Sequence, residues 1–272
     1  MFGAIAGDII GSVYELHPIK TKDFPLFRPQ CRFTDDTVLT VAIAQAIMEE
    51  RDYLKAILEI GRRYPDAGYG GSFFHWLHSS EPKPYNSWGN GSAMRVSPVG
   101  FAFTSVEEVL EEAARTATLS HNHPEGVKGA QATALSVFLG RTEKDKALIK
   151  REVVDRFGYD LDQTMDHIRP FYGFDVSCQG TVPQAIIAFL ESNSYEDAVR
   201  NAISLGGDSD TLGCITGGIA EAYYGSVPPH IKVKVKEHLT EELWDITERF
   251  CQRYVSVKAK TTFDKREGKE EG

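Results

Sequence analysis

Residues 2–15 read FGAIAGDIIGSVYE and residues 206–224 read GGDSDTLGCITGGIAEAYY, and both segments carry small residues at every fourth position. The glycines with this spacing are Gly3, Gly7, Gly11, Gly213 and Gly217. Positions four apart lie on one face of an α-helix, where glycine lets two backbones approach closely. We therefore predict that both segments are helices and that these glycines serve tight helix packing.

Most of the remaining chain also has helical periodicity. Apolar residues after Ser105 follow one helix face, and Ser105 with Glu108 fits a capping box at the start of such a helix. Ser194 and Asp197 fit a second capping box ahead of another amphipathic stretch. These signals predict an all-α fold.

Evidence for strands is weak. The best alternation is at Ile231, Val233 and Val235, but it runs directly into apolar residues at helical spacing from Leu239 to Tyr254. The alternating residues are therefore also compatible with the first turns of that helix.

The chain is predicted to form one compact domain over residues 1–256, because 272 residues with 42% hydrophobic side chains can bury a large core. The stretch from Pro65 to Pro98 is rich in Gly, Pro, Ser and aromatic residues and predicts a long loop, which in a compact domain is usually functional. Residues 257–272 are charged and lack an apolar period, so we expect a disordered tail.

Charge and cysteine usage limit the class of protein. A formal net charge of -9 argues against a surface that neutralises nucleic-acid phosphates or anionic lipids, so neither is expected as a partner. No apolar run approaches the roughly 20 residues of a membrane span, and the first residues lack the basic region of an export signal. The four cysteines lack zinc spacing and fit free thiols. We expect a cytoplasmic monomer.

The first acidic motif is Thr34-Asp35-Asp36, which precedes a mostly apolar helix. Thr34 stands at the N-cap position, and the two aspartates fall in the first turn. Acids there stabilise a helix through its dipole, so this motif alone does not require a metal.

The second acidic motif contains Asp208, Asp210 and Thr211, again at the start of a small-residue helix. It is not an EF-hand, because Leu212 and Ile219 occupy ligand positions of that loop. An aspartyl-phosphatase motif fits poorly, because no buried strand precedes it. What remains is a set of hard oxygen ligands suited to Mg²⁺, Ca²⁺ or Mn²⁺. If the two motifs converge, four carboxylates would repel one another unless cations are bound.

A third motif, Ser87-Trp88-Gly89-Asn90-Gly91, is a glycine-rich turn with an aromatic residue. It fails as a dinucleotide fingerprint because Met94 replaces the third glycine and no strand precedes it. Its backbone N–H groups could still turn toward a phosphate, although a packed structural turn would look the same.

The roles of three further polar residues stay open from the sequence alone. His121 and His123 lie in a polar break between helices, where hydrogen bonding fits better than zinc because no third ligand is near. Glu15 is expected at the end of the first helix, on nearly the same face as Asp8, where a carboxylate is usually solvated.

Several of these motifs together resemble the ADP-ribosylglycohydrolase family. The resemblance covers roughly residues 3 to 225, through GAIAGDIIGSVYE, FTDDT, SWGNGSAMR, SHNHPEG and GGDSDTLGCITGGIAEAYYG in the family's order. It implies a compact all-α fold, two bound Mg²⁺ or Mn²⁺ ions, and hydrolysis of the bond between the distal ribose of ADP-ribose and an acceptor.

The resemblance also implies roles for individual residues. The metal positions are Thr34, Asp35, Asp36, Asp208, Asp210 and Thr211. Glu15 matches a catalytic carboxylate beside the metals, and Asp36 is included with it as catalytic. The residues expected to bind substrate are Ser87, Trp88, Gly89, Asn90, Gly91 and His121. Asp8 is expected to support this site without binding the metals.

The resemblance does not fix the acceptor. Arginine side chains are the favoured acceptor, with serine-linked and small-molecule ADP-ribose as alternatives. Two other classes stay open, a non-catalytic ADP-ribose-binding module and a purely structural protein. Without the family, the acidic motifs would suggest a metal-dependent phosphatase or pyrophosphatase.

Overall fold

The computed structural model describes residues 1–255, and the regular secondary structure of this part of the chain is helical. The helices are α1 Phe2–Gly11, α2 Asp35–Met48, α3 Tyr53–Gly61, α4 Gly71–Leu77, α5 Gly91–Met94, α6 Ser97–Ala102, α7 Val106–Thr118, α8 Pro124–Thr142, α9 Lys146–Phe157, α10 Met165–Ile168, α11 Cys178–Leu190, α12 Tyr195–Ile203, α13 Ser209–Tyr224, α14 Pro229–His238 and α15 Glu241–Phe250, with a π-helical turn at Cys251–Val255. Within residues 1–255 no strand forms, and Gly89 and Ser177 make an isolated antiparallel bridge. The all-α prediction is confirmed. The predicted tail, 257–272, lies outside the described residues.

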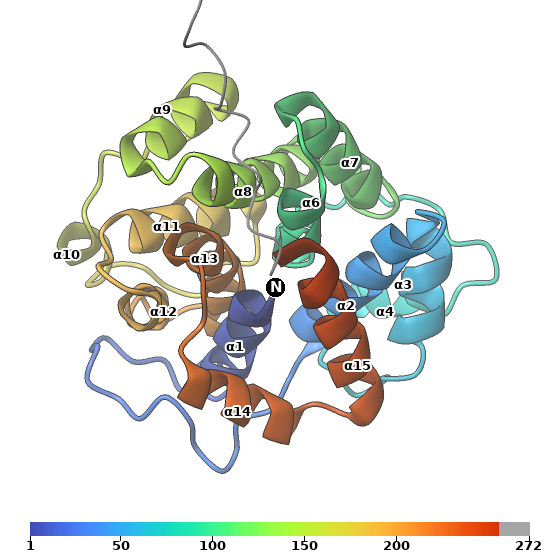
Figure 1. Ribbon diagram of the computed structural model, residues 1–272, viewed down its shortest axis with the longest axis horizontal. Helices are drawn as coiled ribbons and strands as arrows, with labels where there is room; N and C mark the ends of the chain where they lie inside the picture. Colours follow the sequence, from blue (N-terminus) through green and yellow to red (C-terminus); the bar gives the residue numbers. More distant parts are fainter. Residues whose placement is uncertain (256–272) are drawn as a thin grey trace, which may run out of the picture.

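Helices α1 and α13 pack side by side at the centre of the molecule, and the other helices surround them (Figure 1). A Cβ added at Gly7 would lie 1.9 Å from the carbonyl oxygen of Gly213, and one at Gly3 would lie 2.3 Å from that of Gly217. No side chain fits at these distances. The glycines therefore serve tight packing, as predicted, and each glycine segment is the partner of the other.

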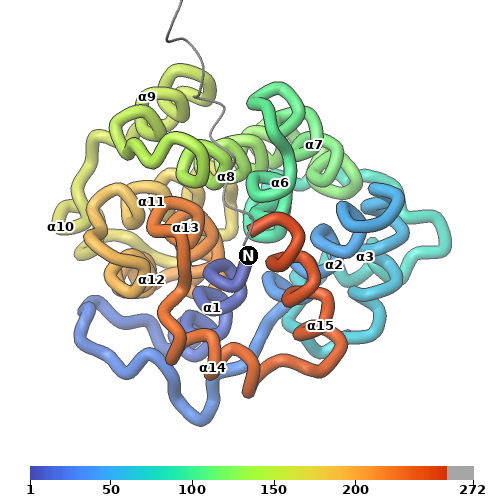
Figure 2. Tube along the Cα trace, in the orientation of Figure 1, coloured from blue at the N-terminus to red at the C-terminus, as the bar shows by residue number. Residues whose placement is uncertain are grey.

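This central contact determines where the acidic motif of α13 lies. A Cβ at Gly11, the last residue of α1, would lie 2.4 Å from the carbonyl oxygen of Ser209, the first residue of α13. The end of α1 therefore meets the beginning of α13. From there the chain makes a long excursion over residues 12–34 along the outside of the molecule before α2 begins (Figure 2).

The predicted helix caps are present. Ser105 accepts a hydrogen bond from the backbone N–H of Glu108, and Ser194 accepts one from that of Asp197. In a capping box the acidic side chain accepts from the backbone N–H of the capping serine itself. Here Glu108 accepts from the N–H of Thr104 and Asp197 accepts from that of Asn193, one residue earlier in each case. Both helices therefore begin where the sequence predicts.

Three details of the sequence interpretation need correction. The alternating residues Ile231, Val233 and Val235 belong to helix α14, where Ile231 and Val235 are buried and Val233 is exposed. The apolar stripe that begins at Leu239 is split between two helices, because Leu239 ends α14 and the side chain of Thr240 caps α15.

The third correction concerns the stretch between Pro65 and Pro98. It is not one loop, since it contains the short helices α4 and α5 and the beginning of α6. These helices are 4 to 7 residues long, too short for their apolar period to stand out among the glycines and aromatic residues.

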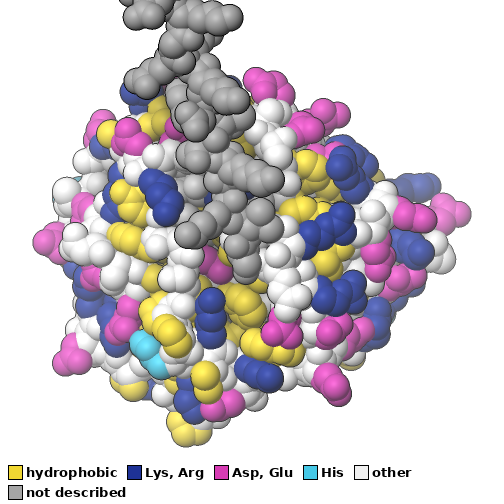
Figure 3. Space-filling view, in the orientation of Figure 1, with side chains coloured by type: hydrophobic (Ala, Val, Ile, Leu, Met, Phe, Trp, Pro, Cys, Tyr) yellow, Lys and Arg dark blue, Asp and Glu magenta, His cyan; other side chains and the backbone are white. Residues whose placement is uncertain are grey.

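Surface charge and the state of the cysteines are two further features of the fold. Acidic and basic side chains are interspersed on the face shown in Figure 3. All four cysteines are buried and free. No helix within residues 1–255 is long and apolar enough to span a membrane.

Candidate metal and ADP-ribose site

A cavity of about 560 Å³ opens beside the α1–α13 contact and is lined by all the residues that the sequence assigned to a site. These are Glu15, Thr34, Asp35, Asp36, Ser87, Trp88, Gly89, Asn90, Gly91, His121, Asp208, Asp210 and Thr211. The wall also includes residues that the sequence did not single out, among them Arg32, Phe73, Arg95, Phe174 and Val176. The fold thus brings together motifs that are up to 196 positions apart in the chain, from Glu15 to Thr211.

On one side of the cavity, Asp8 holds the beginning of α2 in place. Its carboxylate accepts hydrogen bonds from the backbone N–H and hydroxyl of Thr34, at 3.0 and 2.7 Å, and from both the N–H and hydroxyl of Thr37. Thr34 in turn caps α2 by accepting from the N–H of Asp36. Asp8 is fully buried, so its role is to orient the motif that faces the cavity.

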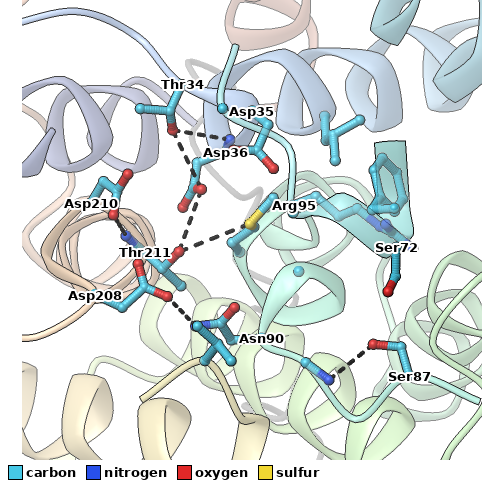
Figure 4. A pocket seen from close by; sticks show the side chains of 18 of the residues that line it. Thr34, Asp35, Asp36, Ser72, Ser87, Asn90, Arg95, Asp208, Asp210 and Thr211 are labelled. Carbon is cyan, nitrogen blue, oxygen red and sulfur yellow. Dashed lines mark hydrogen bonds between the residues drawn. The ribbon is translucent and has the colours of Figure 1, made fainter. Parts of the chain in front are cut away.

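On the opposite side, the beginning of α13 carries Asp208, Asp210 and Thr211 (Figure 4). The hydroxyl of Thr211 donates to Oδ1 of Asp36 over 3.4 Å and so links the two acidic motifs directly. The side-chain amide of Asn90 donates to Oδ2 of Asp208 at 2.7 Å. The convergence of the two motifs, which the sequence could only raise as a hypothesis, is present in the structure.

Glu15 also joins this cluster. One carboxylate oxygen from each of Glu15, Asp208 and Asp210 lies within 4.8 Å of the other two. The sequence placed Glu15 at the end of the first helix and on the face of Asp8, which is wrong, because α1 ends at Gly11. Since helix periodicity stops there, spacing from Asp8 could not have predicted where the Glu15 side chain points.

Burial and mutual repulsion raise the pKa values of the clustered carboxyl groups. Burial, with the negative charges of Asp8 and Asp208, raises the pKa of Asp35 to about 8. The pKa values of Asp36 and Asp210 are also raised well above the ordinary range, mainly by burial and then by neighbouring aspartates. Burial and the charge of Asp208 raise the pKa of Glu15. The cluster binds protons more tightly than separate carboxyl groups would.

The arrangement fits hard divalent cations. Oδ2 of Asp36 is buried without a hydrogen-bond partner among residues 1–255, and the neighbouring donors are carboxylate and hydroxyl oxygens. Buried carboxylates that lack partners are stabilised by a bound cation, and oxygen ligands of this kind suit Mg²⁺ and Mn²⁺.

The loop from Ser87 to Gly91 lines another wall of the cavity, but part of its backbone is already engaged. The N–H of Gly89 donates to the Ser87 hydroxyl, and the N–H of Asn90 donates to the carbonyl of Val176. Two of the amides expected to face a phosphate therefore bond within the protein. The Trp88 side chain is 47% exposed and lines the cavity together with exposed Phe174.

The two histidines of the polar break have different positions. His123 does not line the cavity and caps α8 by accepting from the N–H of Glu125. His121 lines the cavity and is nearly fully buried, with Nδ1 2.8 Å from the Ser120 hydroxyl. Burial, with the positive charge of Arg95, lowers the pKa of His121 well below its ordinary value, so its ring is neutral.

Arg95 is the residue of the wall that sequence reasoning missed most clearly. It is fully buried at the end of α5, and its guanidinium lies over the ring of Phe73. An arginine in the SWGNGSAMR motif gives no sequence signal that separates a buried position from an exposed one.

The fold and the cavity define an all-α protein with an acidic, solvent-open site built from the ends of helices. Residues 1–260 match the ADP-ribosylglycohydrolase family. The chain therefore belongs to this family of glycohydrolase-type enzymes, and the resemblance read from the motifs is confirmed.

Individual relatives agree with this assignment. The chain is 26% identical to ADP-ribosylhydrolase ARH3 of Xenopus tropicalis, over 94% of this chain and 96% of the relative. It is 24% identical to ADP-ribosylarginine hydrolase Tri1 of Pseudomonas putida, over 90% and 76% of the two chains. A solved structure described as an ADP-ribosylglycohydrolase-related protein complex has a similar fold, with a TM-score of 0.65, 22% identity, and coverage of 92% of this chain and 96% of that chain.

Proposed function

We propose that this protein releases ADP-ribose from an acceptor by metal-dependent hydrolysis of the bond at the distal ribose. The observation that carries the proposal is the convergence of Glu15 with both acidic motifs in one cavity. Family membership supplies the reaction class, and the cavity supplies the groups that the reaction requires.

Thr34, Asp35 and Asp36 on α2 and Asp208, Asp210 and Thr211 on α13 would hold two Mg²⁺ or Mn²⁺ ions. When bound, the cations supply the positive charge that offsets the carboxylates and attracts the ribose hydroxyl groups. The contact between Thr211 and Asp36 supports a shared site, because it keeps the two motifs at a fixed separation.

Glu15 is proposed as the group that moves a proton. Hydrolysis adds the oxygen of water to the anomeric carbon while the bond to the acceptor breaks, and one proton must pass from the water to the acceptor. A carboxylate beside the anomeric carbon can take that proton from water and return it to the leaving acceptor. Asp36, whose Oδ2 is free of hydrogen bonds to described residues, is proposed to act beside it.

The rest of the cavity is proposed to bind ADP-ribose. Ser87, Trp88, Gly89, Asn90 and Gly91 form one wall, and His121 stands behind the two glycines. With the Gly89 and Asn90 N–H groups already bonded, the remaining polar atoms of this wall and the neutral His121 ring are left to contact the substrate.

For the acceptor we propose protein arginine. The similarity to an ADP-ribosylarginine hydrolase supports this choice. Serine-linked and small-molecule ADP-ribose are the alternatives.

The test is incubation of the protein and Mg²⁺ with arginine-linked and serine-linked ADP-ribosyl peptides, followed by mass spectrometry. The proposal predicts intact ADP-ribose and unmodified arginine peptide, and loss of both products in Glu15→Gln. AMP as the product would indicate a pyrophosphatase instead, and binding of ADP-ribose without any release would indicate a non-catalytic module.

A further inference from the structure

The wall of the cavity behind the glycine loop contains a chain of three buried side chains. Nη2 of Arg95 donates to the Ser120 hydroxyl at 3.1 Å, and that hydroxyl is 2.8 Å from Nδ1 of His121. Arg95 and Ser120 are both 0% exposed. The same Nη2 also donates to the carbonyl of Thr116, so both of its protons are used.

The direction of the hydrogen bond between Ser120 and His121 follows from these contacts. The Ser120 oxygen accepts from Arg95, and within residues 1–255 Nδ1 of His121 is the remaining partner of the hydroxyl. If Nδ1 carried the ring proton, the Ser120 hydroxyl proton would be buried without an acceptor, which is unfavourable. Ser120 therefore donates to Nδ1, and in the neutral ring the proton resides on Nε2.

Nε2 of His121 points toward the glycine loop. A Cβ added at Gly91 would lie 3.0 Å from Nε2, and one at Gly89 would lie 3.6 Å from it. No hydrogen bond from Nε2 forms within the described residues, and His121 lines the cavity. A proton on Nε2 is thus available for an oxygen atom of a bound molecule.

We infer that Arg95 and Ser120 are positioning residues that fix His121 as the Nε2–H tautomer, so that it donates a hydrogen bond to an oxygen of ADP-ribose. This role rests on the proposed function for its ligand, whereas the tautomer itself does not. Nε and Nη1 of Arg95 are buried without hydrogen-bond partners among residues 1–255, so the two bonds of Nη2, to Ser120 and to the Thr116 carbonyl, are the hydrogen bonds that hold the guanidinium in place.

The tautomer can be observed directly. In protein labelled with ¹⁵N-histidine, two-dimensional spectra report which ring nitrogen is protonated, and His121→Asn identifies the resonances of this ring. The wild-type protein is expected to show an unprotonated Nδ1 and a protonated Nε2. Ser120→Ala and Arg95→Met are expected to shift the ring toward the Nδ1–H tautomer. Ser136→Ala is the matched control, because it removes another fully buried serine hydroxyl, one that bonds to the Ala132 carbonyl within α8.

Binding of ADP-ribose in the presence of Mg²⁺, measured by calorimetry, tests the role. Ser120→Ala should bind roughly 3- to 10-fold more weakly than wild type, the range for one neutral hydrogen bond, and Ser136→Ala should bind as wild type does. A protonated Nδ1 in the wild type, or Ser120→Ala binding as tightly as wild type, overturns the inference. If the wild type binds no ADP-ribose, the proposed function fails, and the spectra still decide the tautomer.

Discussion

The carboxylate cluster makes the stability of the metal-free protein depend on pH in an unusual direction, and Asp35 shows this most clearly. The pKa of Asp35 is raised from its ordinary value of 3.8 to about 8 in the folded protein. The folded state therefore holds this proton more tightly than the unfolded chain does. The stabilisation from this group is complete below pH 4 and is lost as the pH rises toward 8.

The size of the effect follows from linkage. Between pH 5 and 7 a group that is protonated when folded and ionised when unfolded loses about 1.4 kcal/mol of stability per pH unit, or about 3 kcal/mol in total. Asp35 is only partly buried, so solvent screening reduces this to roughly 1–3 kcal/mol. At 2–4 °C per kcal/mol, the melting temperature should fall by roughly 2–12 °C relative to a variant that cannot ionise there.

The assay is calorimetry of the wild type, Asp35→Asn and Asp155→Asn in chelator, at pH values from 5 to 8. Asp155 is an exposed residue of α9 outside the cavity and serves as the control. The difference between wild type and Asp35→Asn should grow with pH in favour of Asp35→Asn, while Asp155→Asn follows wild type. Saturating Mg²⁺ should remove the pH dependence and add about 3 kcal/mol at 100 times its dissociation constant. Parallel curves for wild type and Asp35→Asn in chelator would show that the pKa of Asp35 is not raised in the folded protein.

Three further predictions concern single positions. Gly7→Ala places a Cβ 1.9 Å from a backbone oxygen of α13. It should lower the free energy of unfolding, measured by urea denaturation, by more than about 3 kcal/mol. Unchanged stability would show that α1 and α13 can move apart at little cost. Asp8→Asn removes the charged acceptor of four hydrogen bonds at the start of α2. The variant should have both a lower melting temperature and weaker Mg²⁺ binding. Loss of Mg²⁺ binding with unchanged stability would contradict the role of Asp8 in holding α2 in place. Asn90→Ala leaves Asp208 without its amide donor and should weaken Mg²⁺ binding by about 10-fold in calorimetric titration, with wild-type affinity as the contrary result.

The fold was largely predictable because its main signals are local. The glycine spacing and the caps at Ser105 and Ser194 depend on residues within one or two turns, and all of them are present in the structure. Where local signals weaken, the predictions failed: the helices between Pro65 and Pro98 are too short to show a period, and Thr240 separates two helices within an apparently continuous stripe.

The site was only partly predictable because it depends on contacts between distant segments. Each acidic motif alone looked like a helix start, and nothing in the sequence shows that Thr211 reaches Asp36. Glu15 was found only through the family resemblance, since it lies beyond the end of α1, where periodicity no longer applies. Arg95 was missed because burial of a charged side chain depends on tertiary packing.

We propose that the residues of one cavity bind divalent metal and catalyse hydrolysis of the ADP-ribosyl bond with the help of Glu15. The most direct test is a single release assay on an arginine-linked ADP-ribosyl peptide with wild type, wild type in excess chelator, Glu15→Gln and Asp155→Asn. Release of intact ADP-ribose by wild type and Asp155→Asn, with loss in chelator and in Glu15→Gln, is the predicted result. Full release in excess chelator, or by Glu15→Gln, would contradict it.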